Sequence, residues 1–194
     1  MADTSITMPK FAELIRQWVP NPTTIMEIGA LDGADAVFLK SQFPDADVYA
    51  IEALRQNFDR YLLNLPGVTA FNALIGAKNE QVTFYEKRIN GLHGMFDRGS
   101  RYGTKQYPVQ CYRLDDFCAN LGLPAPDVYK IDVEGAEYEI VAELARANRL
   151  DFDIILAEAH LGLEKFLALL PGYRAVETVR HSDLRSNVSL VRER

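Results

Sequence analysis

The stretch that decides the fold is Thr23-Thr-Ile-Met-Glu-Ile-Gly-Ala-Leu-Asp-Gly33. Its first six residues, 23–28, include the apolar Ile25, Met26 and Ile28 and predict a buried strand, and the glycines that follow predict a turn. Residues 34–43 then repeat apolar side chains at helical spacing, which predicts a helix. A buried strand that leads through a glycine turn into a helix is typical of a parallel sheet covered by helices.

The same alternation continues in both directions along the chain, and it predicts an α/β fold with a mostly parallel sheet and helices on both faces. The last two strands follow each other closely, which indicates an antiparallel hairpin. The expected helices cover residues 9–19, 34–43, 54–65, a short segment that ends at Leu121, 135–148 and 162–170. The expected strands cover residues 23–28, 48–51, 68–75, 81–86, 107–114, 128–133, 153–157, 173–179 and 187–192.

Composition places the chain among ordinary globular proteins. It has 194 residues, 48% of them hydrophobic and 25% charged, which predicts one domain over residues 1–194 with a helical segment in residues 1–22. No apolar run approaches the ~20 residues that span a bilayer, and no secretory signal is visible, so we expect a cytoplasmic protein that does not bind a membrane. The net charge of −6 argues against a nucleic-acid partner. Two cysteines provide neither a disulfide framework nor a zinc cluster.

The glycine turn limits the choice of cofactor. Nicotinamide-binding folds need G-x-G-x-x-G, but Leu31 and Ala34 stand where the second and third glycines would fall, which argues against an oxidoreductase. The pattern from Glu27 to Gly33, acid-x-Gly-x-x-x-Gly, is instead typical of proteins that bind S-adenosylmethionine (SAM). A purely structural turn explains the glycines about as well.

Glu52 is the second candidate for cofactor binding. It ends the second expected strand, 23 residues after Gly29. An acid about 20 residues beyond the glycines commonly accepts hydrogen bonds from ribose hydroxyls. The alternative is a solvated glutamate at a strand end, but the spacing and the strand position both favour the ribose role.

Four segments together resemble the FkbM-type SAM-dependent methyltransferases. They are Glu27–Gly33, Arg113-Leu-Asp-Asp-Phe117, Val128-Tyr-Lys-Ile-Asp-Val-Glu-Gly-Ala-Glu137 and Glu158-Ala-His160. The resemblance runs from about residue 24 to 180 and implies a Rossmann-like class I methyltransferase fold. Such a fold has a seven-stranded sheet in the order 3-2-1-4-5-7-6, with the last strand antiparallel. The first turn departs from the family pattern Asp-x-Gly-Ala-Asn-x-Gly, because Leu31 replaces the asparagine.

The resemblance implies O-methylation of a hydroxyl on a sugar, glycan or other small hydroxylated metabolite. On this basis we expect His160 to be the general base, since a neutral imidazole suits a hydroxyl near pH 7. Asp132 or Glu134 would orient the acceptor or the SAM amine. A strand-end histidine bonded to the backbone is an equally good interpretation of His160. The predicted cofactor residues are Glu27, Gly29, Ala30, Asp32, Gly33, Glu52, Ala53, Asn72, Ala73 and Asp132.

Two further features leave alternatives open. The long loop over residues 87–105 predicts a mobile lid whose His93, Arg98 and Arg101 bind an anionic acceptor, although a solvated loop is as good an explanation. Asp132, Glu134, Glu158 and His160 could together hold a divalent metal ion. The resemblance does not require a metal, and we predict none.

The sequence therefore predicts an enzyme that binds SAM and a small acceptor. The alternative is an interaction module that keeps the fold and binds SAM without methyl transfer, which the altered first turn would permit. The sequence identifies neither the acceptor nor the oligomeric state.

Overall fold

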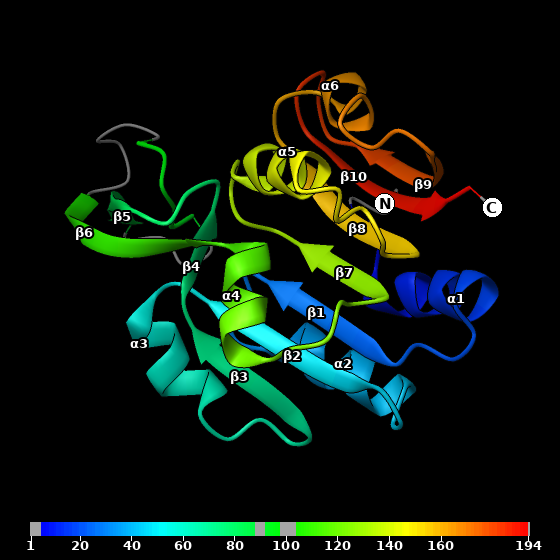
Figure 1. Cartoon of the computed structure of the whole chain (residues 1–194), viewed down its shortest axis with the longest axis horizontal. Helices are drawn as coiled ribbons and strands as arrows, with labels where there is room; N and C mark the ends of the chain where they lie inside the picture. The colour runs from blue at the N-terminus through cyan, green and yellow to red at the C-terminus, as the bar shows by residue number, and fades with distance from the viewer. Residues whose placement is uncertain (1–4, 88–91, 98–103, 194) are drawn as a thin grey trace.

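A seven-stranded sheet forms the centre of the computed structural model, which describes residues 5–87, 92–97 and 104–193 (Figure 1). In spatial order its strands are β3 (Val68–Asn72), β2 (Asp47–Glu52), β1 (Thr24–Ile28), β7 (Val128–Ile131), β8 (Ile154–Ala159), β10 (Ser186–Arg192) and β9 (Tyr173–Arg180). β10 runs antiparallel to both β8 and β9, and the other neighbouring strands of this sheet are parallel. The order and the antiparallel last strand confirm the fold that the resemblance implied.

Helices cover both faces of this sheet, as predicted. They are α1 (Met8–Trp18), α2 (Ala34–Gln42), α3 (Arg55–Asn57) with a following π-helical turn (Phe58–Leu62), α4 (Leu114–Leu121), α5 (Glu137–Arg146) and α6 (Leu163–Leu167). One apolar core lies between the sheet and α4, α5 and α6, and a second lies between the sheet and α1 and α2. Figure 1 shows α4 in front of the sheet and α2 behind it.

Local sequence explains the first helix and strand. Thr7 caps α1 by accepting a hydrogen bond from the Lys10 backbone, and a proline stands in the first turn. Phe11 and Ile15, four residues apart on one face of α1, are completely buried. All five residues of β1 are buried too, because the strand is central and covered on both faces.

The expected third strand, 68–75, was wrong in one respect: the chain divides it between two sheets. β3 pairs with β2 as far as Asn72, opposite Glu52, where β2 ends. The Asn72 amide donates hydrogen bonds to the carbonyls of Glu52 and Ala53, at 2.8 and 3.2 Å, and so fixes the bend. Beyond this bend, β4 (Leu74–Gly76) pairs with a strand outside the main sheet, because β2 has already ended at Glu52.

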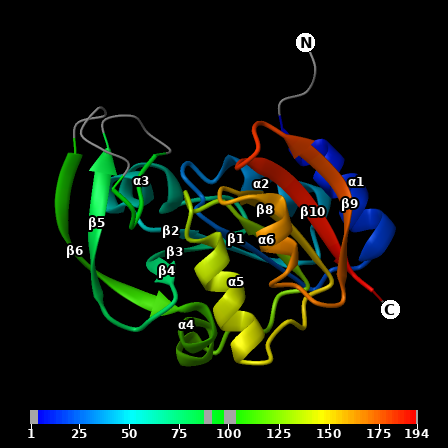
Figure 2. The same ribbon diagram turned by 90° about the horizontal axis from the view of Figure 1, so that it is seen from above.

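That partner belongs to a small sheet that the sequence did not predict. Its order is β4-β6-β5, with β5 at Gln81–Lys87 and β6 at Thr104–Arg113. Figure 2 shows β5 and β6 at the opposite end of the molecule from β9 and β10. The small sheet therefore adds a wall beside the β1–β2 side of the main sheet.

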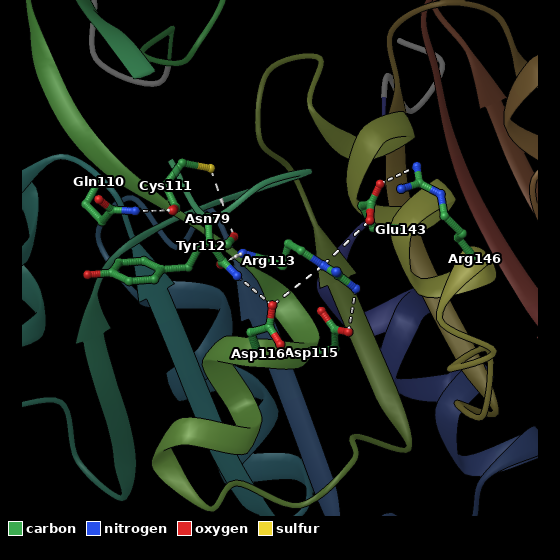
Figure 3. Close-up of polar contacts among 9 residues, drawn as sticks. All are labelled: Asn79, Gln110, Cys111, Tyr112, Arg113, Asp115, Asp116, Glu143 and Arg146. Atoms are coloured by element: carbon green, nitrogen blue, oxygen red, sulfur yellow. Dashed lines mark hydrogen bonds and ion pairs between the residues drawn. The ribbon is translucent and has the colours of Figure 1, made fainter. Parts of the chain in front are cut away.

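Arg113 joins this small sheet to the helical layer (Figure 3). Its guanidinium lies 2.8 Å from Asp115, 3.7 Å from Asp116 and 3.6 Å from the buried Glu143 of α5. Its backbone N–H donates to the Asn79 side chain at 2.8 Å. The Leu-Asp-Asp segment that contributed to the resemblance thus has a structural role at the junction of β6, α4 and α5.

Several predicted boundaries shift for local reasons. β7 ends at Ile131, two residues early, because Glu134 and Gly135 adopt positive φ angles of 55° and 110° and turn the chain. The following helix consequently begins at Glu137 instead of residue 135. Within the described ranges, no helix is long and apolar enough to cross a bilayer.

Candidate functional site

A pocket opens where β1, β2 and β7 end, at their carboxyl edge. It is lined by Ile28 and Gly29 after β1, by Ile51, Glu52 and Ala53 after β2, and by Asp132, Val133 and Glu134 after β7. The chain leaves β1 for β2 on one side and returns as β7 on the other, so strand order reverses here. Ligands of open α/β sheets bind at such switch points.

Gly29 allows the edges of β1 and β7 to meet. Its φ is +86°, and a Cβ added there would lie 2.9 Å from the carbonyl carbon of Asp132 and closer still to the carbonyl oxygen. Glycine tolerates this backbone conformation without strain. Gly33 has a different role: a Cβ there would overlap the Leu65 side chain, and Gly33 precedes the first residue of α2 instead of lining the pocket.

Glu52 presents a buried, firmly held carboxylate to the pocket. One oxygen accepts a hydrogen bond from the Leu31 N–H at 2.8 Å, and the other accepts from the Leu54 N–H at 2.7 Å. Burial raises the pKa of the Glu52 carboxyl, although these N–H groups and the Asn57 side chain oppose the rise. Each carboxylate oxygen has two acceptor sites, so this arrangement retains capacity for a ligand's hydroxyl groups.

The small sheet and the segment 92–97 complete the wall. Phe84 of β5 and Leu74 and Ile75 of β4 make the inner surface apolar. Gly94 pairs with Tyr85 through two backbone hydrogen bonds, so that the segment lies against β5. Nδ1 of His93 accepts a hydrogen bond from the Lys87 N–H at 3.0 Å, and burial lowers the pKa of this imidazole. His93 is therefore a neutral, pocket-lining side chain at pH 7.

The turn after β7 brings two more carboxylates to the pocket, those of Asp132 and Glu134. Burial raises the pKa of Asp132, against the lowering effect of Lys130, and the neighbouring Glu158 adds to the rise. Glu134 holds a left-handed backbone conformation that is uncommon for residues other than glycine.

His160 lies beside these carboxylates but does not line the pocket. Its Nδ1 hydrogen-bonds to the fully buried Glu137, and its Nε2 faces Glu158 at 3.5 Å and Glu134 at 3.7 Å. Burial lowers the pKa of the imidazole, but the hydrogen bond and charge of Glu137, with the charges of Glu158 and Glu134, raise it further than burial lowers it. The net pKa lies above that of an ordinary histidine.

The structure distributes the predicted cofactor residues between the pocket and its supports. Gly29, Glu52, Ala53, Ala73 and Asp132 line the pocket. The remaining five lie outside the lining and hold the surrounding backbone: Glu27 contacts Lys130 at 2.8 Å, Ala30 donates to Ile51, Asp32 accepts from the Ala34 N–H, Gly33 packs on Leu65, and Asn72 fixes the β3–β4 bend. Among the predicted substrate residues His93 lines the pocket, whereas Arg98 and Arg101 lie outside the described residues.

Sequence reasoning missed most of the apolar lining. Besides Ile28 and Ile51, the lining residues that were not named for the site are the apolar Leu31, Leu74, Ile75, Phe84, Met95, Val133 and Ala136, together with Gly94 and the polar Asn57. Three of them had a usable signal: Val133 and Ala136 stand inside the most specific segment of the resemblance, and Leu31 stands inside the glycine turn. Leu74, Ile75, Phe84, Gly94 and Met95 reach the pocket through the small sheet and the segment beside it, whereas Asn57 belongs to α3.

Comparisons with known proteins agree with this geometry. The family described as the methyltransferase FkbM domain matches residues 27–185. The 2-O-methyltransferase NoeI of Sinorhizobium fredii is 28% identical, and the match covers 81% of this chain and 74% of NoeI. The fold is similar to that of a solved FkbM methyltransferase from Methylobacillus flagellatus, with a TM-score of 0.55 and 16% identity over 88% of this chain and 44% of that one.

A solved O-methyltransferase from Bacillus cereus in complex with SAH has a similar fold as well. Its TM-score is 0.54, with 16% identity over 99% of this chain and 83% of that one. The family match spans far more than half of the sequence and includes the strands, turns and carboxylates of the pocket. The chain therefore belongs to the FkbM methyltransferase family and is an enzyme that uses SAM as its cofactor.

Proposed function

We propose that this methyltransferase O-methylates a hydroxyl group on a sugar, a glycan or another small hydroxylated metabolite. The observation that supports it most is the pair of carboxylates, Asp132 and Glu134, beside a pocket whose inner wall is apolar. Carboxylates can orient an acceptor hydroxyl and take its proton. The similarity to NoeI, which is named as a 2-O-methyltransferase, supports an oxygen as the methyl acceptor.

The pocket has the hydrogen-bond acceptor and the apolar surface that SAM requires. When bound, SAM supplies the methyl group as an electrophilic sulfonium substituent. Glu52 would accept hydrogen bonds from the ribose hydroxyls, because its carboxylate is fixed at the end of β2. Ala53, Ala73 and Phe84 offer an apolar surface to a flat base.

The acceptor's proton must leave as its oxygen forms the new bond to carbon. We assign this proton to Asp132 in preference to His160, because Asp132 lines the pocket and burial brings its pKa closer to neutral pH. His160 does not line the pocket, and its Nδ1 is held by Glu137, so its imidazole lies behind the carboxylates instead of in the pocket. Glu134 and His93, which also line the pocket, would orient the acceptor.

Positioning should account for more of the rate than proton removal. Holding two reactants in near-attack geometry supplies roughly 7–11 kcal/mol of a barrier. A positioned base adds about 10²–10⁴-fold in rate, which corresponds to roughly 3–5 kcal/mol. Loss of Asp132 should therefore slow the enzyme without abolishing catalysis.

The test is methyl transfer from radiolabelled SAM to a panel of acceptors: mono- and oligosaccharides, other polyols, and amines and thiols for comparison. We expect label only in hydroxylated products, and we expect Asp132→Asn to lower kcat about 10²–10⁴-fold while SAM still binds. Asp45→Asn, an exposed site between α2 and β2, is the matched control and should retain full activity. Label confined to amines or thiols would overturn the proposal. Tight SAM binding without transfer to any acceptor would favour the non-catalytic module.

A further inference from the structure

His160 lies behind the pocket in an acidic cluster with Glu134, Glu137 and Glu158, and one of its two ring nitrogens makes no hydrogen bond to the residues that the structure describes. The His160 side chain is only 7% exposed. Its Nδ1 is occupied by Glu137, whereas its Nε2 is buried and has no hydrogen-bond partner among the residues that the structure describes. Nε2 is directed at two carboxylate oxygens, Oε2 of Glu158 and Oε2 of Glu134.

The distances in this group suit a shared ion better than hydrogen bonds. Nε2 lies 3.5 Å from Glu158 Oε2 and 3.7 Å from Glu134 Oε2, both beyond the usual range for an N–H···O bond. Ligand atoms about 2.1 Å from one metal ion, at angles of 90–120°, lie about 3.0–3.6 Å apart. All three atoms lie within 4.8 Å of one another. A small inward movement would therefore place them around a common centre.

The charges of the cluster favour a cation at that centre. Three carboxylates, those of Glu134, Glu137 and Glu158, surround His160, and Arg185 is the cation paired with Glu158, at 2.5 Å. Carboxylates that lie close together in a buried place repel one another. A divalent cation between them would offset this repulsion.

Glu137 and Arg185 hold two of the proposed ligand residues in the way that outer residues hold the ligands of known metal sites. A metal-binding histidine commonly donates its second ring N–H to a carboxylate, which fixes its orientation. Glu137 accepts from Nδ1 of His160 in this way. Arg185 binds Oε1 of Glu158 and so leaves Oε2 directed at His160.

From these observations we infer that His160, Glu134 and Glu158 form a binding site for a divalent cation, with Glu137 and Arg185 as positioning residues. One imidazole and two carboxylates suit Mn²⁺ and similar first-row ions. Because Glu134 also lines the pocket, the ion would lie next to the acceptor, where it could lower the pKa of a bound hydroxyl. That use of the ion rests on the proposed function, whereas the binding itself does not.

The test is titration of the chelator-treated, purified chain with MnCl2, followed by electron paramagnetic resonance (EPR) and calorimetry. We expect one Mn²⁺ per chain, and pulsed EPR should detect the nitrogen of a coordinated imidazole in the wild-type complex. His160→Gln and Glu158→Gln should weaken binding at least 100-fold. Glu137→Gln should weaken it about 10–100-fold, as expected for a carboxylate that orients a ligand. His181→Gln, at an exposed histidine, is the matched control and should bind as the wild type does.

Two results would overturn the inference. One is a folded wild-type chain that binds neither Mn²⁺, Mg²⁺ nor Zn²⁺ at millimolar concentration, in which case the cluster is an ion-pair network alone. The other is Mn²⁺ binding without nitrogen coordination and with unchanged affinity in His160→Gln. The wild-type EPR measurement remains decisive even if a variant fails to fold. Because none of these measurements uses an acceptor, failure of the proposed O-methylation would leave their outcome unaffected.

Discussion

Replacing Gly29 with alanine should damage both the fold and the cofactor site. The added Cβ would overlap the carbonyl oxygen of Asp132 and lie 3.3 Å from Val133 Cγ1, so it would press on the turn that closes the pocket. Backbone atoms cannot rotate away as the end of a flexible side chain can. The edges of β1 and β7 would therefore have to separate.

Two contributions set the size of this effect. A left-handed backbone conformation, here at φ +86°, costs a residue with a Cβ roughly 1–2 kcal/mol. Overpacking in a well-filled interior costs about 1–3 kcal/mol more. Gly172 provides the matched control, because its φ is +81° and nothing lies within 4 Å of an added Cβ. Gly172→Ala should therefore cost the first contribution alone.

The assay is urea unfolding of both variants and the wild type, followed by the fluorescence of the single tryptophan, Trp18. Gly29→Ala should lower the free energy of unfolding by about 2 kcal/mol more than Gly172→Ala. Titration with SAM should show affinity at least about tenfold weaker in Gly29→Ala, since a movement of 1 Å in a binding site can cost that much, and no change in Gly172→Ala. Equal destabilisation by the two substitutions, with equal SAM affinity, would refute the role given to Gly29.

Three further perturbations test separate parts of the account. Glu52→Gln should weaken SAM binding about 10–100-fold in calorimetry, because hydrogen bonds to a charged group contribute roughly 1.5–3 kcal/mol; Glu13→Gln is the exposed control, and a tight Glu52→Gln complex would contradict the ribose role. Arg113→Met should destabilise the chain by about 2 kcal/mol in urea unfolding, since the Arg113 side chain is only 33% exposed and its guanidinium bonds to carboxylates. Arg146→Met removes a 72% exposed arginine and should cost less than about 1 kcal/mol, so equal losses would argue against the junction. Because burial holds the pKa of His93 below its ordinary value, protonation favours the unfolded chain, and the free energy of unfolding should fall as the pH drops below about 6.5. His93→Asn should lose this part of the pH dependence in denaturation measured from pH 5 to 8, and an unaltered profile would show that His93 does not contribute.

The sequence was sufficient for the main sheet because its signals are local. Residues 23–33 contain a strand, a turn and the start of a helix in one uninterrupted pattern, and such patterns depend on neighbours along the chain. The third strand shows the limit of this reasoning. Its apolar run continues past Asn72, but pairing ends where β2 ends, and only the tertiary structure determines that point.

The candidate site was predictable to the extent that its residues stand at strand ends. Glu52, Asp132 and Glu134 follow predicted strands and line the pocket. Phe84 and Met95 could not be assigned from the sequence, because the small sheet and the segment beside it bring them to the pocket from distant positions. The environment of His160 was equally hidden, since its partner Glu137 is 23 residues away and belongs to another element.

The central claim is that the pocket at the ends of β1, β2 and β7 binds SAM. Calorimetric titration of the purified, ligand-free chain with SAM tests it most directly, with NAD⁺ titrated separately as the comparison. The account predicts one micromolar site for SAM, weakened in Glu52→Gln and Gly29→Ala, and no response to NAD⁺. A folded chain that binds no SAM, or that binds it equally well in both variants, would contradict the account.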